Sequence, residues 1–398
     1  MPRTKRTSPA KQKSKPAEPS KPAQAIRFAH PFFDTLQPDQ RASTGPFGRR
    51  MLDHIRGTLH PIPPVRGSGR LTLADVIGNQ GSDAIALSHQ ITLHIAGDTG
   101  VPETDHETKQ VMVADAMAKD YDPAHPETSP AFFLHVGDVI YGPAPGSYLD
   151  QFYRPNMHYP GKIVAIPGNH DGESDVKIRD FQKYFCAAKQ KVPPIAGSIF
   201  RQTMTLPGVY WCLDAPFLQI VGLYSNSAEN PGFISGPSIG QVQKKWLVKT
   251  LSSLRASRAG GVRKALMIIT HHPPFSSGGH SGSTQMLADI DDACTKAGIM
   301  PDAFFSGHAH SIQRYTRTVQ FGGRSLRIPY VVTGCAGHGG QAVAPPPAHK
   351  SGNPEYDFSY EGWGYTKVQV TAHDLKILSY GVDAAGARLI DTFQTGLA

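Results

Sequence analysis

The stretch IVAIPGNHD, residues 163–171, joins an apolar run to a turn that carries metal-binding side chains. Short apolar runs of this kind, here Lys162–Ile166, are typical of strands buried on both faces of a sheet. An apolar run precedes a charged or metal-binding side chain at four other places as well. The runs span residues 91–96, 131–136, 265–270 and 303–305, and they lead to Asp98, Asp138, His271 and the sequence Gly307-His308-Ala309-His310.

Helical patterns separate these predicted strands, at residues 108–119, 174–188, 238–256 and 284–297. Strands that alternate with helices predict an α/β fold, in which a largely parallel or mixed sheet is covered by helices. The carboxyl ends of the strands line the ligand crevice of such a sheet. We therefore expect the five polar turns to converge on one edge of the molecule.

The composition is that of a loop-rich globular protein of 398 residues, with 39% hydrophobic residues, 18% charged residues, 40 Gly and 34 Pro. No run approaches the roughly 20 apolar residues of a membrane-spanning helix, and no secretory signal is visible. The four cysteines lie far apart, so we expect buried thiols and neither a zinc ribbon nor a disulfide scaffold. The sequence predicts no membrane association and a cytoplasmic location.

The positive charge is concentrated at the N-terminus. Residues 1–24 hold seven basic side chains and a single acid, whereas the whole chain has a formal net charge of +8. The remainder carries only +2, which argues against a nucleic-acid groove. The tail could touch nucleic acid or anionic lipid, but its Lys, Pro, Ser and Ala residues favour a solvated, disordered segment.

Three segments differ in composition and pattern. We predict a disordered basic tail over residues 1–24, an N-terminal extension with edge strands over 25–90, and a catalytic domain over 91–398. Residues 71–77 and 85–96 have the patterns of strands, and residues 49–56 have the pattern of a short helix.

The side chains that follow the strands form a set of oxygen and nitrogen donors. Carboxylates, an amide oxygen and imidazoles suit hard or borderline metal ions and do not suit Cu(I) or an iron–sulfur cluster. Each fragment alone is common, but the ordered set is specific because an apolar strand precedes each fragment. The donors exceed what one tetrahedral ion uses, so we predict a two-metal site of the kind that hydrolyses phosphate esters. The set is Asp98, Asp138, Tyr141, Asn169, His271, His308 and His310.

These motifs, in this order, resemble those of the calcineurin-like metallophosphoesterases. They are Gly97-Asp98, Gly137-Asp138, Gly168-Asn169-His170-Asp171, His271-His272-Pro273-Pro274 and Gly307-His308-Ala309-His310. The first motif continues as Thr99-Gly100 and lacks the usual histidine, while Tyr141 follows Asp138 by three residues. This exchange is similar to the purple acid phosphatase pattern. The resemblance covers about residues 91–340 and implies a four-layer αββα sandwich of two mixed sheets flanked by helices.

The resemblance also implies a binuclear metal centre of Fe(III) and a divalent Fe, Zn or Mn ion. The ligands implied for Fe(III) are Asp98, Tyr141 and His310; those for the divalent ion are Asn169, His271 and His308. Asp138 would bridge the two ions. A metal-bound hydroxide would then attack the phosphorus of a phosphate monoester in line.

Two histidines remain outside this ligand set. By the same resemblance, His170 and His280 would bind the phosphate and protonate the leaving group. Asp171 would orient His170 through its ring N–H. His338 follows the predicted strand 330–333 and could line the crevice, although Gly-rich turns after strands are common. Three other histidines are expected to be structural: His94, His135 and His272.

The predicted activity is acid phosphatase-type hydrolysis of small-molecule phosphate esters. Two alternatives stay open: a phosphodiesterase or nuclease of the same superfamily, and a non-catalytic protein that binds metal and phosphate on the same fold. The missing histidine of the first motif argues against the cyclic-nucleotide type. No specific nucleic-acid partner is expected, and the sequence defines no oligomeric state.

Overall fold

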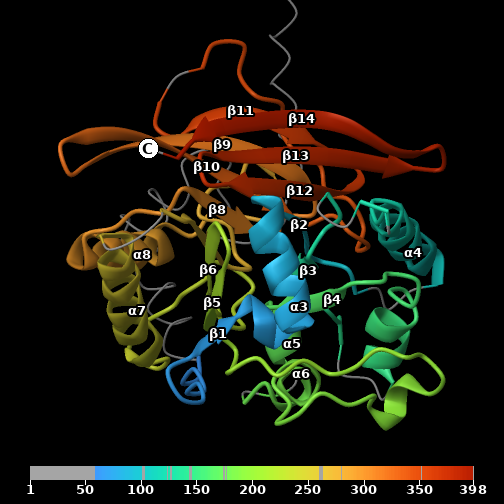
Figure 1. Ribbon diagram of the computed structural model, residues 1–398. Coiled ribbons are helices and arrows are strands. Elements are labelled where there is room, and N and C mark those ends of the chain that lie inside the picture. Colours follow the sequence, from blue (N-terminus) through green and yellow to red (C-terminus); the bar gives the residue numbers. More distant parts are fainter. Residues whose placement is uncertain are drawn as a thin grey trace, which may run out of the picture.

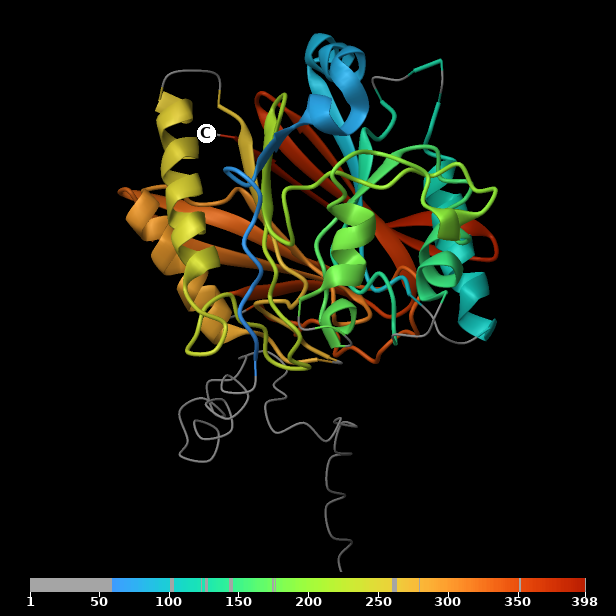
Figure 2. The same cartoon turned by 90° about the horizontal axis from the view of Figure 1, so that it is seen from below.

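The computed structural model describes residues 59–397, apart from short gaps at 101–103, 123, 126–127, 143–145, 174, 176, 260–262, 279 and 351. The tail predicted over residues 1–24 and the helix predicted over residues 49–56 lie outside the described residues. Within them, two mixed sheets pack against each other and helices cover both outer faces (Figures 1 and 2).

The larger sheet has eight strands in the order β1-β5-β6-β7-β8-β10-β9-β11. Its centre is parallel, since β6, β7, β8 and β10 run the same way, and β9 and β11 continue it in antiparallel fashion. The bounds are β1 Arg70–Thr72, β5 Trp211–Ala215, β6 Leu218–Gly222, β7 Ala265–Ile269, β8 Ala303–Ser306, β9 Ile312–Phe321, β10 Arg324–Thr333 and β11 Glu355–Tyr360.

The smaller sheet has six strands in the order β14-β13-β12-β2-β3-β4. β2, β3 and β4 are parallel, with Phe133 opposite both His94 and Ile163, and the three C-terminal strands extend them in antiparallel fashion (Figure 1). The bounds are β2 Gln90–Ala96, β3 Phe132–His135, β4 Lys162–Ala165, β12 Trp363–Thr371, β13 Asp374–Asp383 and β14 Gly386–Gly396.

The helices lie on opposite sides of the paired sheets, with α7 and α8 on one side and α4 on the other (Figure 2). The helices are α3 Leu73–Ser88, α4 Thr104–Ala118, α5 His170–Glu173, α6 Arg179–Phe185, α7 Val242–Ala259 and α8 Thr284–Ala297, with short turns at Leu149–Tyr153 and Pro194–Ala196. No helix within the described part of the chain is both long and apolar enough to cross a bilayer.

The alternation along β7 explains the layers. Met267 and Ile269 point into the core between the two sheets, whereas Leu266 and Ile268 point into a second core beneath α7 and α8. A strand with apolar side chains on both faces must be covered on both faces. The predicted αββα sandwich is therefore confirmed, and the four cysteines are buried and free, as expected.

Two segments depart from the predicted elements. The helix α3, which is interrupted at Gly78, replaces most of the strand predicted over 71–77 and the start of the strand predicted over 85–96. The strand β2 begins only at Gln90. The cause is a capping box, in which Thr72 and Asp75 exchange hydrogen bonds between side chain and backbone. The helix predicted over 174–188 is confined to α6, whereas α8 has the predicted bounds.

Candidate metal centre

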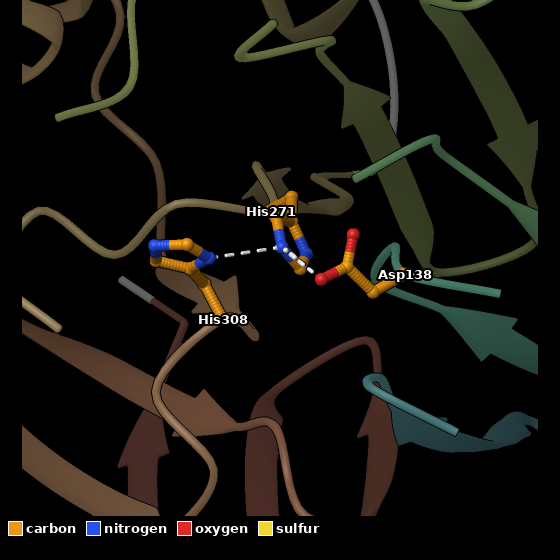
Figure 3. A group of neighbouring side chains, drawn as sticks. All are labelled: Asp138, His271 and His308. Carbon is orange, nitrogen blue, oxygen red and sulfur yellow. Dashed lines mark hydrogen bonds and ion pairs between the residues drawn. The ribbon is translucent and has the colours of Figure 1, made fainter. Parts of the chain in front are cut away.

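The turns that follow five parallel strands meet at one edge of the molecule. Asp98, Asp138 and Asn169 follow β2, β3 and β4 of the smaller sheet, while the histidines of the site follow β7 and β8 of the larger sheet. His271 joins the two sheets, because its Nε2 atom lies 3.2 Å from Asp138 Oδ2 (Figure 3). The same Nε2 atom lies 3.0 Å from Asn169 Oδ1. The structure thus brings the predicted donors together as the strand pattern required.

One set of donor atoms forms a triangle, which we call the oxygen-rich group: Asp98, Tyr141 and His310. Tyr141 Oη lies 3.2 Å from both Asp98 Oδ1 and His310 Nε2, and the latter two atoms are 3.4 Å apart. Metal–ligand bonds of about 2.0–2.2 Å place adjacent donors about 3 Å apart. The three atoms are therefore spaced to share one ion.

A second set lies beside the first, and we call it the nitrogen-rich group: Asn169, His271 and His308. His271 Nε2 is at its centre, 3.0 Å from Asn169 Oδ1 and 3.2 Å from His308 Nδ1. The donor atoms of Asp138, His271 and His308 all lie within 4.8 Å of one another. Only 4.0 Å separates His271 Nε2 from Asp98 Oδ1, so the two groups adjoin.

Asp138 lies beside the nitrogen-rich group, with Oδ2 3.2 Å from His271 Nε2, and its charge also acts on Tyr141 of the oxygen-rich group. One carboxylate oxygen, Oδ1, accepts the backbone N–H of His170 at 3.0 Å. The other, Oδ2, is buried, faces His271 and accepts no hydrogen bond from the described residues. A buried carboxylate oxygen without a donor is costly unless a cation satisfies it. This oxygen and the convergent lone pairs around it fit a metal pair.

Backbone carbonyls fix the direction of two imidazoles. His271 Nδ1 lies 3.0 Å from the carbonyl oxygen of Val136, and His310 Nδ1 lies 3.1 Å from that of Gly339. A carbonyl oxygen only accepts, so each Nδ1 carries a proton and the Nε2 lone pair faces the cluster when the ring is neutral. Such partners are typical of metal-ligating histidines.

Three of the donors have a left-handed backbone. The φ angles are 57° at Asp98, 54° at Asp138 and 69° at His308. This conformation costs of order 1–3 kcal/mol for a residue with a side chain, and it clusters at functional sites. At Gly137 a Cβ atom would lie only 2.6 Å from His271 Nδ1, which explains the glycine before Asp138.

The charges of the cluster support one another. Burial raises the pKa of Asp138, but His271 and His170 lower it more, so the carboxyl stays ionised. Burial lowers the pKa of His271, but Asp138 and Asp98 raise it to about 9. Burial and the same two carboxylates raise the pKa of Tyr141 well above its usual value. Protons therefore compete with metal ions for this site.

His170 lies beside the oxygen-rich group. Its ring packs on Tyr141 with 4.4 Å between centroids, and its Nδ1 atom pairs with Glu173 Oε2 at 3.0 Å. Burial lowers the pKa of His170, but Asp138 and Glu173 raise it to about 9. His170 is thus positively charged at neutral pH.

The expected contact from Asp171 to His170 is wrong. Both carboxylate oxygens of Asp171 accept backbone N–H groups, from Gly168 at 2.8 Å, Val139 at 3.2 Å and Ile140 at 3.3 Å. Asp171 thereby holds the turn after β3 in place. Glu173 reaches His170 instead because residues three apart share one face of a helix.

His280 lies beside the nitrogen-rich group. Its ring is 4.0 Å from that of His308, and its two nitrogens face the side-chain amides of Asn230 at 2.9 Å and Gln341 at 3.0 Å. Burial and the nearby His310 lower the pKa of His280 well below its usual value. His280 is therefore neutral, in contrast to His170.

The sequence did not predict several residues around the donors. Glu229 Oε2 accepts a hydrogen bond from Asn169 Nδ2 at 3.3 Å, which leaves the Asn169 oxygen directed at the cluster. Gln151 brackets the backbone of Tyr141, accepting its N–H at 2.7 Å and donating to its carbonyl at 3.0 Å. Among the partners that the sequence analysis missed, only Glu173 could have been found from sequence. It follows His170 by three residues, a spacing that places both on one face of a helix.

Of the remaining histidines, one lies at the crevice and three have structural contacts, as expected. His338 stacks on the Tyr141 ring with 4.0 Å between centroids and 7° between planes, so it does line the crevice. His272 is held by Ser225 and the Ala228 carbonyl, each at 2.8 Å. His94 of β2 and His135 of β3 are buried and hydrogen-bonded, to Tyr159 and Thr99 respectively.

Comparison with known proteins agrees with this geometry. Residues 91–311 match the calcineurin-like phosphoesterase family, and the chain belongs to that family. No curated protein matches the sequence.

Solved structures share the fold at low identity. The purple acid phosphatase PPD1 of yellow lupin (Lupinus luteus) is 14% identical with a TM-score of 0.52 over 77% of this chain, and the chain covers 53% of that protein. GAP50 of Plasmodium, described as the anchor in the inner membrane complex, is 11% identical with a TM-score of 0.54 over 78% of this chain and 89% of its own. At these identities the likeness concerns the fold alone.

Proposed function

We propose that the protein is a two-metal phosphomonoesterase of the acid phosphatase type. The oxygen-rich group would hold Fe(III), the nitrogen-rich group a divalent Fe, Zn or Mn ion, and Asp138 would reach both. The observation that carries the proposal is the triangle of Tyr141, Asp98 and His310, with edges of 3.2–3.4 Å. A phenol in this position suits a hard, strongly Lewis-acidic ion, since the surrounding carboxylates otherwise keep it protonated.

When bound, the two ions would supply Lewis acidity that lowers the pKa of a water molecule and offsets phosphoryl charge. His170, whose Nδ1 atom is held by Glu173, would donate the proton that the leaving alkoxide requires. His280, held neutral between Asn230 and Gln341, would hydrogen-bond a phosphoryl oxygen. Asp171 would support the turn that carries Asp138.

The proposed substrates are small-molecule phosphate esters, and the proposed catalytic unit begins at residue 91. The described part of the preceding extension supplies the edge strand β1 and places Leu73 and Val76 of α3 in the core between the sheets. It therefore supports the domain and adds no candidate donor to the site.

The test combines metal quantification with turnover of two chromogenic esters, p-nitrophenyl phosphate and bis(p-nitrophenyl) phosphate. We expect two metal ions per chain and faster hydrolysis of the monoester. Preference for the diester would favour the phosphodiesterase alternative. Full metal loading without turnover of either ester would favour a binding protein on this fold.

A further inference from the structure

A cavity lies near the ends of the strands opposite to those that carry the metal centre. Its volume is about 580 Å³, and it lies between the C-terminal ends of α7 and α8 and the hairpin that joins β9 to β10. Asp302, before the start of β8, lines this cavity, whereas His308 follows the end of β8. Six residues of extended chain, about 20 Å at about 3.3 Å each, separate the two places.

Arginines dominate the lining of this cavity. Five of the lining residues are arginines and one, Asp302, is an acid. The chain beyond residue 24 has a formal net charge of only +2, so this is a local concentration of charge. The five arginines are Arg255, Arg258, Arg263, Arg324 and Arg327.

Carboxylates neutralise only part of this charge. Asp302 serves two guanidinium groups, those of Arg258 at 2.9 Å and Arg263, and also accepts the backbone N–H of Leu266. Arg327 pairs with Glu355 at 3.2 Å. Arg255 and Arg324 are exposed and form no ion pair with the described residues. Two guanidinium groups are thus available to a ligand.

Hydrogen bonds and packing hold two of the lining arginines, Arg258 and Arg255, in place. Arg258 is partly buried and donates to the carbonyl oxygen of Lys264 as well as to Asp302, while its Nε atom is buried without an acceptor among the described residues. The Arg255 side chain packs against Gly298. A Cβ atom at Gly298 would lie 3.1 Å from Arg255 Nε. Gly298 has a φ angle of 68°, so the glycine both ends α8 and leaves room for the arginine.

The chemistry of the lining defines the ligand. A guanidinium group binds phosphate through two parallel hydrogen bonds, and several such groups favour more than one phosphoryl group. Ile299, Phe321 and Leu326 supply an apolar wall for a carbon skeleton. The volume falls within the range of small-molecule sites. We infer that this cavity is a second anion site, separate from the metal centre, for a small organic compound that carries two or more phosphoryl groups.

Calorimetric titration of the metal-loaded protein with imidodiphosphate, which resists hydrolysis, tests the inference. We expect two binding events, one at the metal centre and one at the cavity. The double variant Arg255→Gln/Arg324→Gln should weaken one event at least tenfold and leave the other unchanged. Both side chains are exposed, so the fold should be retained, which circular dichroism would verify.

A matched control and a reciprocal variant make the result decisive. Arg388→Gln removes an exposed arginine of β14 outside the cavity and should leave both events unchanged. His280→Ala should weaken only the event at the metal centre. A double variant that binds imidodiphosphate with the stoichiometry and affinity of the wild type would overturn the inference. Failure of the proposed phosphatase activity would leave this test unaffected, because no readout depends on turnover.

Discussion

The oxygen-rich and nitrogen-rich groups are both buried and lie side by side, yet they offer different chemistry. Asp98 and Tyr141 supply two oxygens against the single imidazole of His310, whereas His271 and His308 supply two nitrogens against one amide oxygen. Hard oxygen donors favour a trivalent ion and imidazoles favour borderline divalent ions. We propose from this difference that the fold sorts two unlike metals by ligand type, at sites that adjoin.

The supports of the two groups differ as well. Tyr141 is packed between the rings of His170 and His338, with centroid distances of 4.4 and 4.0 Å. The nitrogen-rich group is held instead by polar side chains, since Glu229 binds Asn169 and Asn230 Oδ1 lies 3.4 Å from His308 Nε2. We therefore expect ring packing to fix the position of the Tyr141 phenol. Hydrogen bonds should fix the positions of the Asn169 amide and the imidazoles.

Removal of the Asp138 charge, which we propose that both metals share, should have the largest effect. In Asp138→Asn the side chain keeps its shape but loses the charge that we propose to reach both groups. We expect affinity for both metals to fall by more than the roughly 10–100-fold typical of outer partners, and turnover to be abolished. Elemental analysis after dialysis measures this. Retention of both ions would show that Asp138 is not shared.

The two uncoordinated histidines should differ from each other. His170→Ala should lose about 10²–10⁴-fold in kcat while both metals stay bound, because the charged donor is removed. The loss should shrink for esters with good leaving groups, which need little protonation. His280→Ala should lose rate equally for all leaving groups, because neutral His280 is proposed to bind phosphate. Identical leaving-group dependence in the two variants would contradict this division.

Glu229 allows one group to be weakened without the other. Glu229→Ala should release the Asn169 amide and lower the affinity for the divalent ion by about 10–100-fold, while the iron is retained. Glu173→Ala is the matched control, since Glu173 contacts His170 and no proposed ligand. It should reduce turnover at unchanged metal content. Equal metal loss in both variants would mean that surface charge, and not the amide contact, is responsible.

A substitution of His135, the last residue of β3, should have the smallest effect on metal binding and turnover. Burial lowers its pKa to about 3, and its Nδ1 atom accepts the Gly137 N–H while Nε2 faces Thr99 Oγ1. The unfolded state therefore binds a proton that the folded state does not between about pH 3 and 6.5. Stability from this group rises with pH across that window and is lost as the pH falls.

The corresponding variant is His135→Asn, which keeps an acceptor for Gly137 and does not titrate. Urea unfolding of both proteins at equal metal loading should show a pH slope about 1.4 kcal/mol per unit smaller in the variant between pH 4 and 6. Parallel slopes would mean that His135 does not stay neutral in the folded protein.

The strands and donors could be predicted from sequence because both signals are local. Each apolar run and the polar residue after it lie within a few positions, as from Lys162 to Asn169. The partners of those donors could not be predicted, since Glu229 and Gln341 meet the site through contacts that span 60 and 61 residues. Asp171 was misassigned because adjacency to His170 says nothing about side-chain direction. The strand predicted over 71–77 was wrong although a local signal was present, since Thr72 and Asp75 form a capping box that begins a helix.

Tyr141→Phe tests the central claim that the two groups sort unlike metals. The substitution removes the donor oxygen and keeps the ring that packs between His170 and His338, so the fold should survive. A phenolate bound to Fe(III) gives a visible charge-transfer band. The measurement is therefore the visible spectrum, with iron content, of the wild type and the variant loaded with iron in air. We predict a coloured wild type and a colourless variant with reduced iron and an intact divalent site. A colourless wild type together with equal iron in the variant would contradict the account.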